Sequence, residues 1–199
     1  MLIVVAHSMK KLLTILLLSL ASCRSGQEEL TISTIYPSSE IIDISGITNY
    51  SNLIKELETY DCTAQHNLLK FKDNYIPVQL GIYCLKGGNF VDFKERNFLR
   101  INDSTDFSQL SIENFILNNG NDPDLSESPY KAIIAINFSD SAKTANVIAK
   151  MTTVNKAYLA IWTRQAKIHF DKHLIELSDN ELEELTMHMY PYRTTVLAP

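Results

Sequence analysis

The chain lacks any apolar run long enough to form a membrane-spanning helix. A bilayer core needs about twenty consecutive apolar residues, whereas the main apolar stretch, residues 12–20, contains nine. The chain also lacks a strong excess of positive charge, since 18 basic and 23 acidic residues leave a formal net charge of −5. Nucleic-acid-binding surfaces are basic, so we expect no nucleic-acid partner.

Common catalytic signatures are missing as well. The sequence contains no G-x-S-x-G, no H-E-x-x-H, no P-loop and no G-x-G-x-x-G. His169 and His173 stand four residues apart, as on one face of a helix, and Glu176 or His188 would be needed to complete a metal site. A solvated helix end explains the same spacing. We therefore expect no enzyme activity, no metal and no cofactor.

A basic and then apolar segment precedes Cys23. Lys10 and Lys11 are followed by the apolar residues 12–20 and then by two small residues, an order typical of a secretory signal. The stretch Leu-Ala-Ser-Cys at residues 20–23 resembles the lipobox of bacterial lipoproteins. This resemblance implies removal of residues 1–22 and acylation of Cys23. Several acyl chains hold a protein on a membrane stably, whereas one chain alone is marginal.

The alternative interpretation is a plain signal peptide followed by a chance cysteine. Met9 begins a complete signal by itself, so translation starts at either Met1 or Met9. Residues 23–30 would be a polar tether facing the periplasm. Arg24 is not an inner-membrane retention aspartate, so known sorting rules favour the outer membrane of the cell envelope.

Two further cysteines, Cys62 and Cys84, form an even pair in an oxidising compartment. A disulfide between them would close a loop of about 23 residues and contribute about 3 kcal/mol in the chain-entropy model. Two buried free thiols are the alternative.

Sequence patterns predict an α+β fold with a β-rich portion at residues 31–96. Alternating and β-branched residues favour strands there, and Pro77 suggests a strand at the edge of a sheet. The predicted elements of this portion are strands at residues 30–36, 67–71, 75–85 and 89–93 and a helix at residues 50–60 capped by Ser51.

The sequence of the second half of the chain predicts a small sheet and three helices. An apolar run at residues 131–138 is typical of a central strand, and short strands are expected at residues 97–101 and 194–197. One helix should start after Asp106 or Ser108. Another should start at Ser178, with Glu181 completing a capping box, and run to about Met189, where Tyr190-Pro191 ends it.

Residues 142–170 contain neither proline nor glycine and predict one long helix. This helix is longer than a domain of this size needs. We therefore expect its apolar stripe to contact a second copy of the chain or another protein. The stripe contains Met151, Val154, Tyr158, Ile161 and Trp162.

Three stretches in residues 97–199 resemble the periplasmic domain of ExbD/TolR-type biopolymer transport proteins, in the form found in Bacteroidetes. They are residues 113–136, the Lys-Ala-Tyr at 156–158, and residues 170–199. The resemblance implies a small sheet with helices on one face. It also implies a role beside ExbB, ExbD and TonB, which couple the proton gradient to transport through the outer membrane.

The sequence departs from that family in two ways. ExbD has a transmembrane helix with a proton-carrying aspartate, and an intramembrane ionisable group is the functional site of such proteins; the apolar segment here has no acid. The family's Asp-Arg-Gly-Thr is replaced by Asp-Ser-Ala-Lys at residues 140–143. We therefore expect a non-catalytic accessory or assembly module. The alternative is a lipoprotein that binds peptidoglycan or a small ligand.

Overall fold

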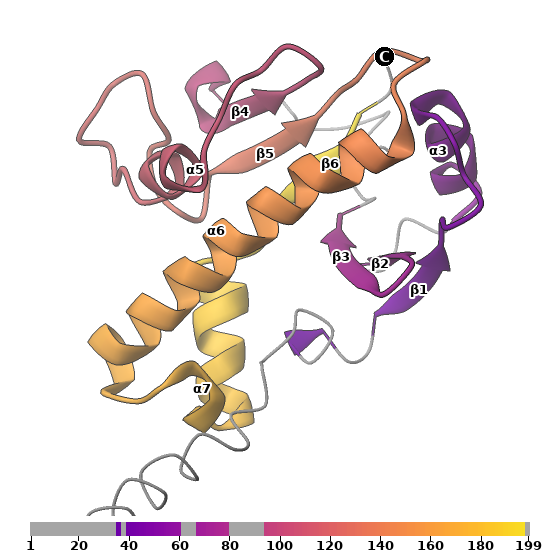
Figure 1. The fold of residues 1–199 in the computed structure, drawn as a ribbon. Coiled ribbons are helices and arrows are strands. Elements are labelled where there is room, and N and C mark those ends of the chain that lie inside the picture. The colour runs from indigo at the N-terminus through magenta and orange to yellow at the C-terminus, as the bar shows by residue number, and fades with distance from the viewer. Residues whose placement is uncertain (1–34, 37–38, 61–66, 80–93, 198–199) are drawn as a thin grey trace, which may run out of the picture. The chain divides into compact units, whose positions relative to one another are not determined.

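The computed structural model describes residues 35–36, 39–60, 67–79 and 94–197. These residues form a mixed α/β fold with two three-stranded sheets and four α-helices, consistent with the predicted α+β class (Figure 1). Cys23, Cys62 and Cys84 lie outside the described residues, as do the predicted signal peptide and tether, the predicted strand at residues 89–93, and the distal part of the predicted strand 75–85. Ile35 and Tyr36 are buried but belong to no strand, unlike the prediction for residues 30–36.

The first sheet comes from the N-terminal portion of the chain. Its strands are β1 (Glu40–Asp43), β2 (Asn67–Phe71) and β3 (Asn74–Val78). β1 pairs with β2 in parallel, and β2 and β3 form an antiparallel hairpin, so β3 is an edge strand. Pro77 lies in this strand, as predicted, because an edge strand tolerates a residue that cannot donate a backbone hydrogen bond.

Helix α3 (Tyr50–Leu57) follows β1 and agrees with the predicted helix. Its N-cap is Asn49, whose side-chain oxygen accepts a hydrogen bond from the backbone N–H of Asn52 at 2.9 Å. The prediction of Ser51 as the cap was wrong. Both residue types cap helices well, and the extended backbone of Asn49 decides which of them precedes the first turn.

The second sheet is parallel, in the order β4-β5-β6, with strands β4 (Phe98–Ile101), β5 (Ile133–Ile136) and β6 (Thr194–Val196). β5 is the central strand, as predicted, and each of its residues is at most 2 % exposed. Burial on both faces is usual in parallel sheets.

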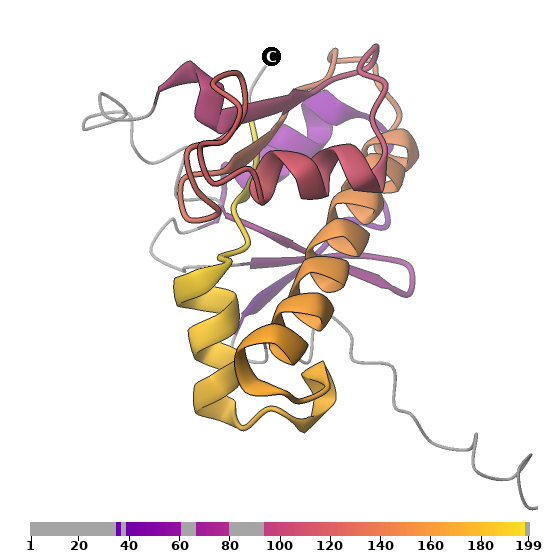
Figure 2. The same cartoon turned by 90° about the vertical axis from the view of Figure 1, so that its left-hand side faces the viewer.

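Three helices connect the parallel strands. Helix α5 (Gln109–Ile116) joins β4 to β5, and Ser108 caps it together with Ser111. Helix α6 (Thr144–Phe170) confirms the long helix and ends at Asp171, whose φ of 54° is left-handed. The chain then returns beside α6 through a short 3₁₀ turn, η3 (Leu174–Glu176), and α7 (Asp179–Glu183) (Figures 1 and 2).

The predicted capping box at Ser178 and Glu181 is present. The helix continues beyond α7 as a π-helical segment, η4 (Glu184–Met189), so its predicted extent to Met189 is correct. In this segment the backbone N–H of Tyr190 donates to the Leu185 carbonyl at 2.9 Å, a step of five residues. Such wide turns are rare and often occur at functional sites.

Backbone hydrogen bonds join the N-terminal portion of the chain to residues 97–199. Thr31–Pro199 forms one compact unit. The backbone N–H of Tyr50 donates to Ala142, that of Thr144 donates to Thr48, and that of Gln79 donates to Thr194. These hydrogen bonds cross the boundary expected at residues 96/97. The two portions therefore share a core.

The side chain of Tyr50 makes a further contact between the two portions. Its side chain is 0 % exposed, and its hydroxyl lies 2.8 Å from the Ile136 carbonyl and 2.6 Å from the Leu197 carbonyl. Burial raises the pKa of Tyr50, so the hydroxyl keeps its proton and donates. It thereby links α3 to the ends of β5 and β6.

We predict that Tyr50→Phe lowers the free energy of unfolding by about 0.5–1.5 kcal/mol, because the hydrogen bonding of the hydroxyl to two carbonyls is lost while ring packing is kept. Denaturant unfolding would measure the change. The control is Tyr60→Phe, since the Tyr60 hydroxyl makes one long hydrogen bond of 3.4 Å to the Glu56 carboxylate. Equal midpoints for both variants would show that the Tyr50 hydroxyl does not stabilise the fold.

Candidate functional site

The apolar stripe of α6 lies in the core of the chain. Met151, Val154, Tyr158, Ile161 and Trp162 are each 0 % exposed. The stripe packs against other elements of this chain instead of facing solvent. The expectation that these five side chains form a contact surface for a partner is therefore corrected: their apolar area is already covered.

The segment between η4 and β6 is one of the surfaces that cover the stripe. The indole N–H of Trp162 donates to the Tyr190 carbonyl at 2.9 Å, and the rings of Tyr158 and Tyr192 lie 4.5 Å apart. The Tyr192 hydroxyl also donates to the Asn155 side chain. Burial raises the pKa of Tyr158 to about 12, so its hydroxyl stays protonated at neutral pH. Helix α6 thus fixes residues 190–193 through both aromatic packing and hydrogen bonds.

The histidines that the sequence singled out are not brought together with a third ligand in the described part of the chain. The Nε2 atom of His169 lies 3.4 Å from the Tyr190 hydroxyl. The Glu176 carboxylate accepts a hydrogen bond from the backbone N–H of His173 at 2.8 Å, so it caps the η3 turn. His188 lies in η4 and lines a separate pocket.

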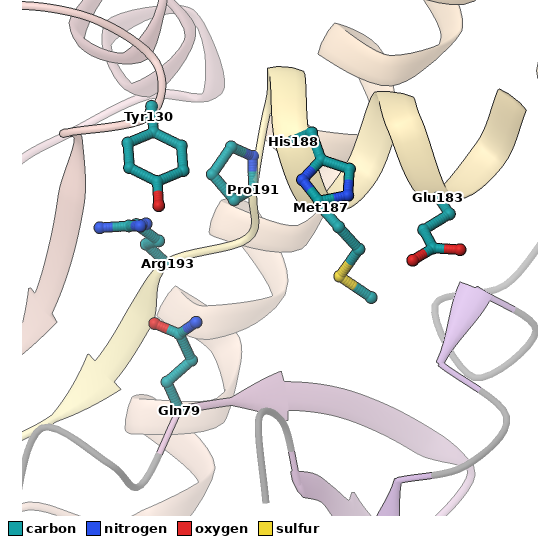
Figure 3. A pocket seen from close by; sticks show the side chains of 7 residues that line it. All are labelled: Gln79, Tyr130, Glu183, Met187, His188, Pro191 and Arg193. Atoms are coloured by element: carbon teal, nitrogen blue, oxygen red, sulfur yellow. The ribbon is translucent and has the colours of Figure 1, made fainter. Parts of the chain in front are cut away.

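That pocket is the candidate functional site (Figure 3). It has a volume of about 350 Å³. It lies where β3 ends, where the loop before β5 passes, and where η4 leads into β6. Its lining residues are Gln79, Tyr130, Glu183, Met187, His188, Pro191 and Arg193. The volume falls at the lower end of the range for small-molecule sites.

Arg193 is held in the pocket by its backbone. Its N–H donates to the Tyr158 hydroxyl at 3.2 Å, and its carbonyl accepts from the backbone N–H of Ile134 at 2.8 Å. Arg193 as a whole is half-buried, and its guanidinium carbon lies 4.2 Å from the centre of the Tyr130 ring, a cation–π contact. Because the backbone fixes the residue, its side-chain donors are not needed to hold the fold.

The loop before β5 places Tyr130. The amide of Asn118 donates to the carbonyls of Asp122 and Ser126, and the Ser126 hydroxyl donates to the Phe115 carbonyl. The buried Asn118 side chain, 7 % exposed, therefore pairs backbone carbonyls that have no partner strand or helix in this loop. A loop fixed in this way presents a half-exposed ring at a defined place.

Sequence reasoning did not single out Arg193, Tyr130 or Gln79. They come from three distant parts of the chain and belong to no motif. The only local signal was Tyr190-Pro191, which marked the end of the last helix. The pocket arises because α6 fixes the segment after that proline beside β3, and no spacing rule encodes this.

Comparisons with protein-family models, with curated proteins and with solved structures give no match. Within the part of the chain that the structure describes, no helix has the length and hydropathy of a membrane span.

The loop before β5 also carries a cluster of charges around Glu127. The Glu127 carboxylate accepts from Lys131 and Lys94, each at 2.6 Å, and lies 3.1 Å from the Arg96 guanidinium. The hydrogen bonds from Lys131 and Lys94 lower the pKa of Glu127 from 4.5 to about 2. The native state therefore favours the ionised carboxylate, and this stabilisation is present above pH 4.5 and is lost as the pH falls towards 2.

We predict that Glu127→Gln lowers stability at pH 7 and makes the decline in stability between pH 4.5 and 2 shallower than in the natural chain. The reason is that the variant has no carboxylate to protonate. Denaturant midpoints across this pH range would measure both effects. Glu95→Gln is the control, because Glu95 pairs with Arg100 at an exposed site. Parallel pH profiles for the natural chain and Glu127→Gln would contradict the prediction.

Proposed function

We propose that this chain is a lipid-anchored protein of the cell envelope and a non-catalytic accessory or assembly module of a TonB–ExbB–ExbD-type transport system. Residues 97–199 would be an ExbD-like domain facing the periplasm. Lipid on Cys23 would replace the transmembrane helix of ExbD, with the outer membrane favoured.

The packing of the three ExbD-like stretches supports this proposal. The backbone N–H of Ile134, in the first stretch, donates to the Arg193 carbonyl in the third at 2.8 Å. The ring of Tyr158, in the second stretch, lies 4.5 Å from that of Tyr192 in the third. Stretches that are distant in sequence thus contribute to one packing unit, as expected if they descend from one domain.

The apolar segment at residues 12–20 contains no acidic residue, which supports an accessory role over that of a proton-driven stator. A stator driven by protons needs an ionisable group within the membrane. Lipid on Cys23 would anchor the chain without supplying such a group. In this role the chain acts by binding, either as a pair of identical chains or with an ExbB-, ExbD- or TonB-type protein.

We predict that the chain, expressed in its own cells, becomes labelled by a fatty-acid analogue and that Cys23→Ala abolishes the label. Mass spectrometry of the N-terminal peptide should show an acylated Cys23. The matched control is Cys62→Ala, which removes another cysteine and should keep the label. A labelled Cys23→Ala chain would exclude this residue as the anchor.

We predict that the tagged full chain, purified in mild detergent, enriches at least one ExbB-, ExbD- or TonB-type protein over an unrelated lipoprotein bait. Quantitative mass spectrometry would measure the enrichment. Purification without any of these proteins would contradict the assembly role.

The pocket of Figure 3 favours a second candidate function, the binding of peptidoglycan or of a small ligand. A polar cavity of this volume is not required for an assembly role. Sedimentation of the purified chain with isolated sacculi, in the absence of transport proteins, would favour this candidate over the first.

A further inference from the structure

The pocket carries opposite charges at its two ends. Figure 3 shows Arg193 on one side, beside Gln79, and Glu183 on the other, with Met187 and His188 between them. These residues come from the end of β3, from α7, from η4 and from the segment before β6. A ligand that fills the pocket therefore meets a cation at one end and an anion at the other.

Arg193 is available to a ligand. Among the described residues it makes no ion pair, and its guanidinium contacts the Tyr130 ring. A guanidinium group presents its donors in a planar fork that matches a carboxylate, and such paired hydrogen bonds are stronger than neutral ones. The half-buried setting screens the interaction less than bulk solvent would.

Glu183 is available in the same sense. It is the last residue of α7 and is exposed, and it makes no ion pair within the described chain. Its neighbour Glu181 is instead occupied by Lys172 at 2.7 Å and by the cap of α7. A carboxylate at the rim of a pocket favours a cationic group such as an ammonium.

The other lining residues and the cavity volume determine the size and shape of ligand that fits the pocket. Pro191 and Met187 supply apolar contact between the charged ends, and the Tyr130 ring lies beside Arg193 at one end (Figure 3). The cavity volume of about 350 Å³ suits a small molecule. A dianionic phosphate would face Glu183 without compensation, and a simple amine would leave Arg193 unpaired.

We propose that the pocket binds a small zwitterion whose carboxylate and ammonium are several bonds apart, such as a short peptide with free termini or an ω-amino acid. Arg193 binds the carboxylate, and Glu183 binds the ammonium. Met187 and Tyr130 contact the body of the ligand. This inference rests on the second candidate function, ligand binding, and is independent of the assembly role.

The test is calorimetric titration of the purified full chain with four probes: trialanine, N-acetyl-trialanine, trialanine amide and 6-aminohexanoate. Binding of trialanine or 6-aminohexanoate supports the proposal. Acetylation removes the ammonium and amidation removes the carboxylate, so each blocked peptide should bind about tenfold more weakly, or worse, than trialanine. A blocked peptide that binds as well as trialanine overturns the proposal.

Two variants with matched controls assign the charges. Arg193→Gln and Glu183→Gln should each weaken binding of the free zwitterion about tenfold or more. Arg100→Gln is the control for the first, since Arg100 also lies over an aromatic ring, Phe98, at 5.7 Å. Glu184→Gln is the control for the second, because Glu184 is adjacent and exposed but does not line the pocket. Both controls should bind like the natural chain.

Methyl NMR of the natural chain keeps the proposal testable if a variant fails to fold. Trialanine or 6-aminohexanoate should shift the Met187 methyl signal, and the Met151 methyl in the core should not respond. No binding of either zwitterion at millimolar concentration, or binding that leaves the Met187 signal unmoved, would overturn the proposal. Sedimentation with sacculi in that case would leave the second candidate function standing without this pocket.

Discussion

The contact between helix α6 and residues 190–193 is the interaction on which the rest of the structure depends. Trp162 holds the Tyr190 carbonyl, and Tyr158 holds both the Tyr192 ring and the Arg193 N–H. The clamped segment leads directly into β6, so the same contacts that bury the long helix also align the last strand with β5. They further place the Arg193 guanidinium beside Tyr130. Core packing and pocket geometry therefore cannot vary independently.

The second constraint is the closure of the carboxyl end of the parallel sheet. Open α/β sheets bind ligands at that end, but here Tyr50 contacts the carbonyls of Ile136 and Leu197 there. Lys150 occupies the turn after β4 by donating to the carbonyls of Asn102 and Thr105. The candidate pocket uses residues that precede β5 and β6, at the opposite end of these strands. The N-terminal portion thus determines which end of the sheet is open.

Local patterns predicted most of the elements but not how they meet. The apolar run around Ile133–Ile136, the capping box at Ser178 and the length of α6 each reflect short-range rules, and these predictions were confirmed. The partner of the apolar stripe is a long-range property, because periodicity shows that one face is buried but not by what. The π-helical turn at η4 and the availability of Arg193 depend on tertiary packing, so the sequence carried no signal for the pocket beyond Tyr190-Pro191.

Burial of the α6 stripe changes how the proposed assembly role would work. The large apolar side chains that remain exposed in the described part are scattered over several elements, among them Leu110, Tyr130 and Ile168. Single exposed apolar residues are common on monomers and do not form the continuous patch of an obligate interface. A partner contact would then be weak by itself. Lipid on Cys23 would compensate, because anchoring two proteins to one envelope raises their effective concentration without adding any contact. In this role the lipid anchor would both locate the protein in the envelope and raise its apparent affinity for a partner.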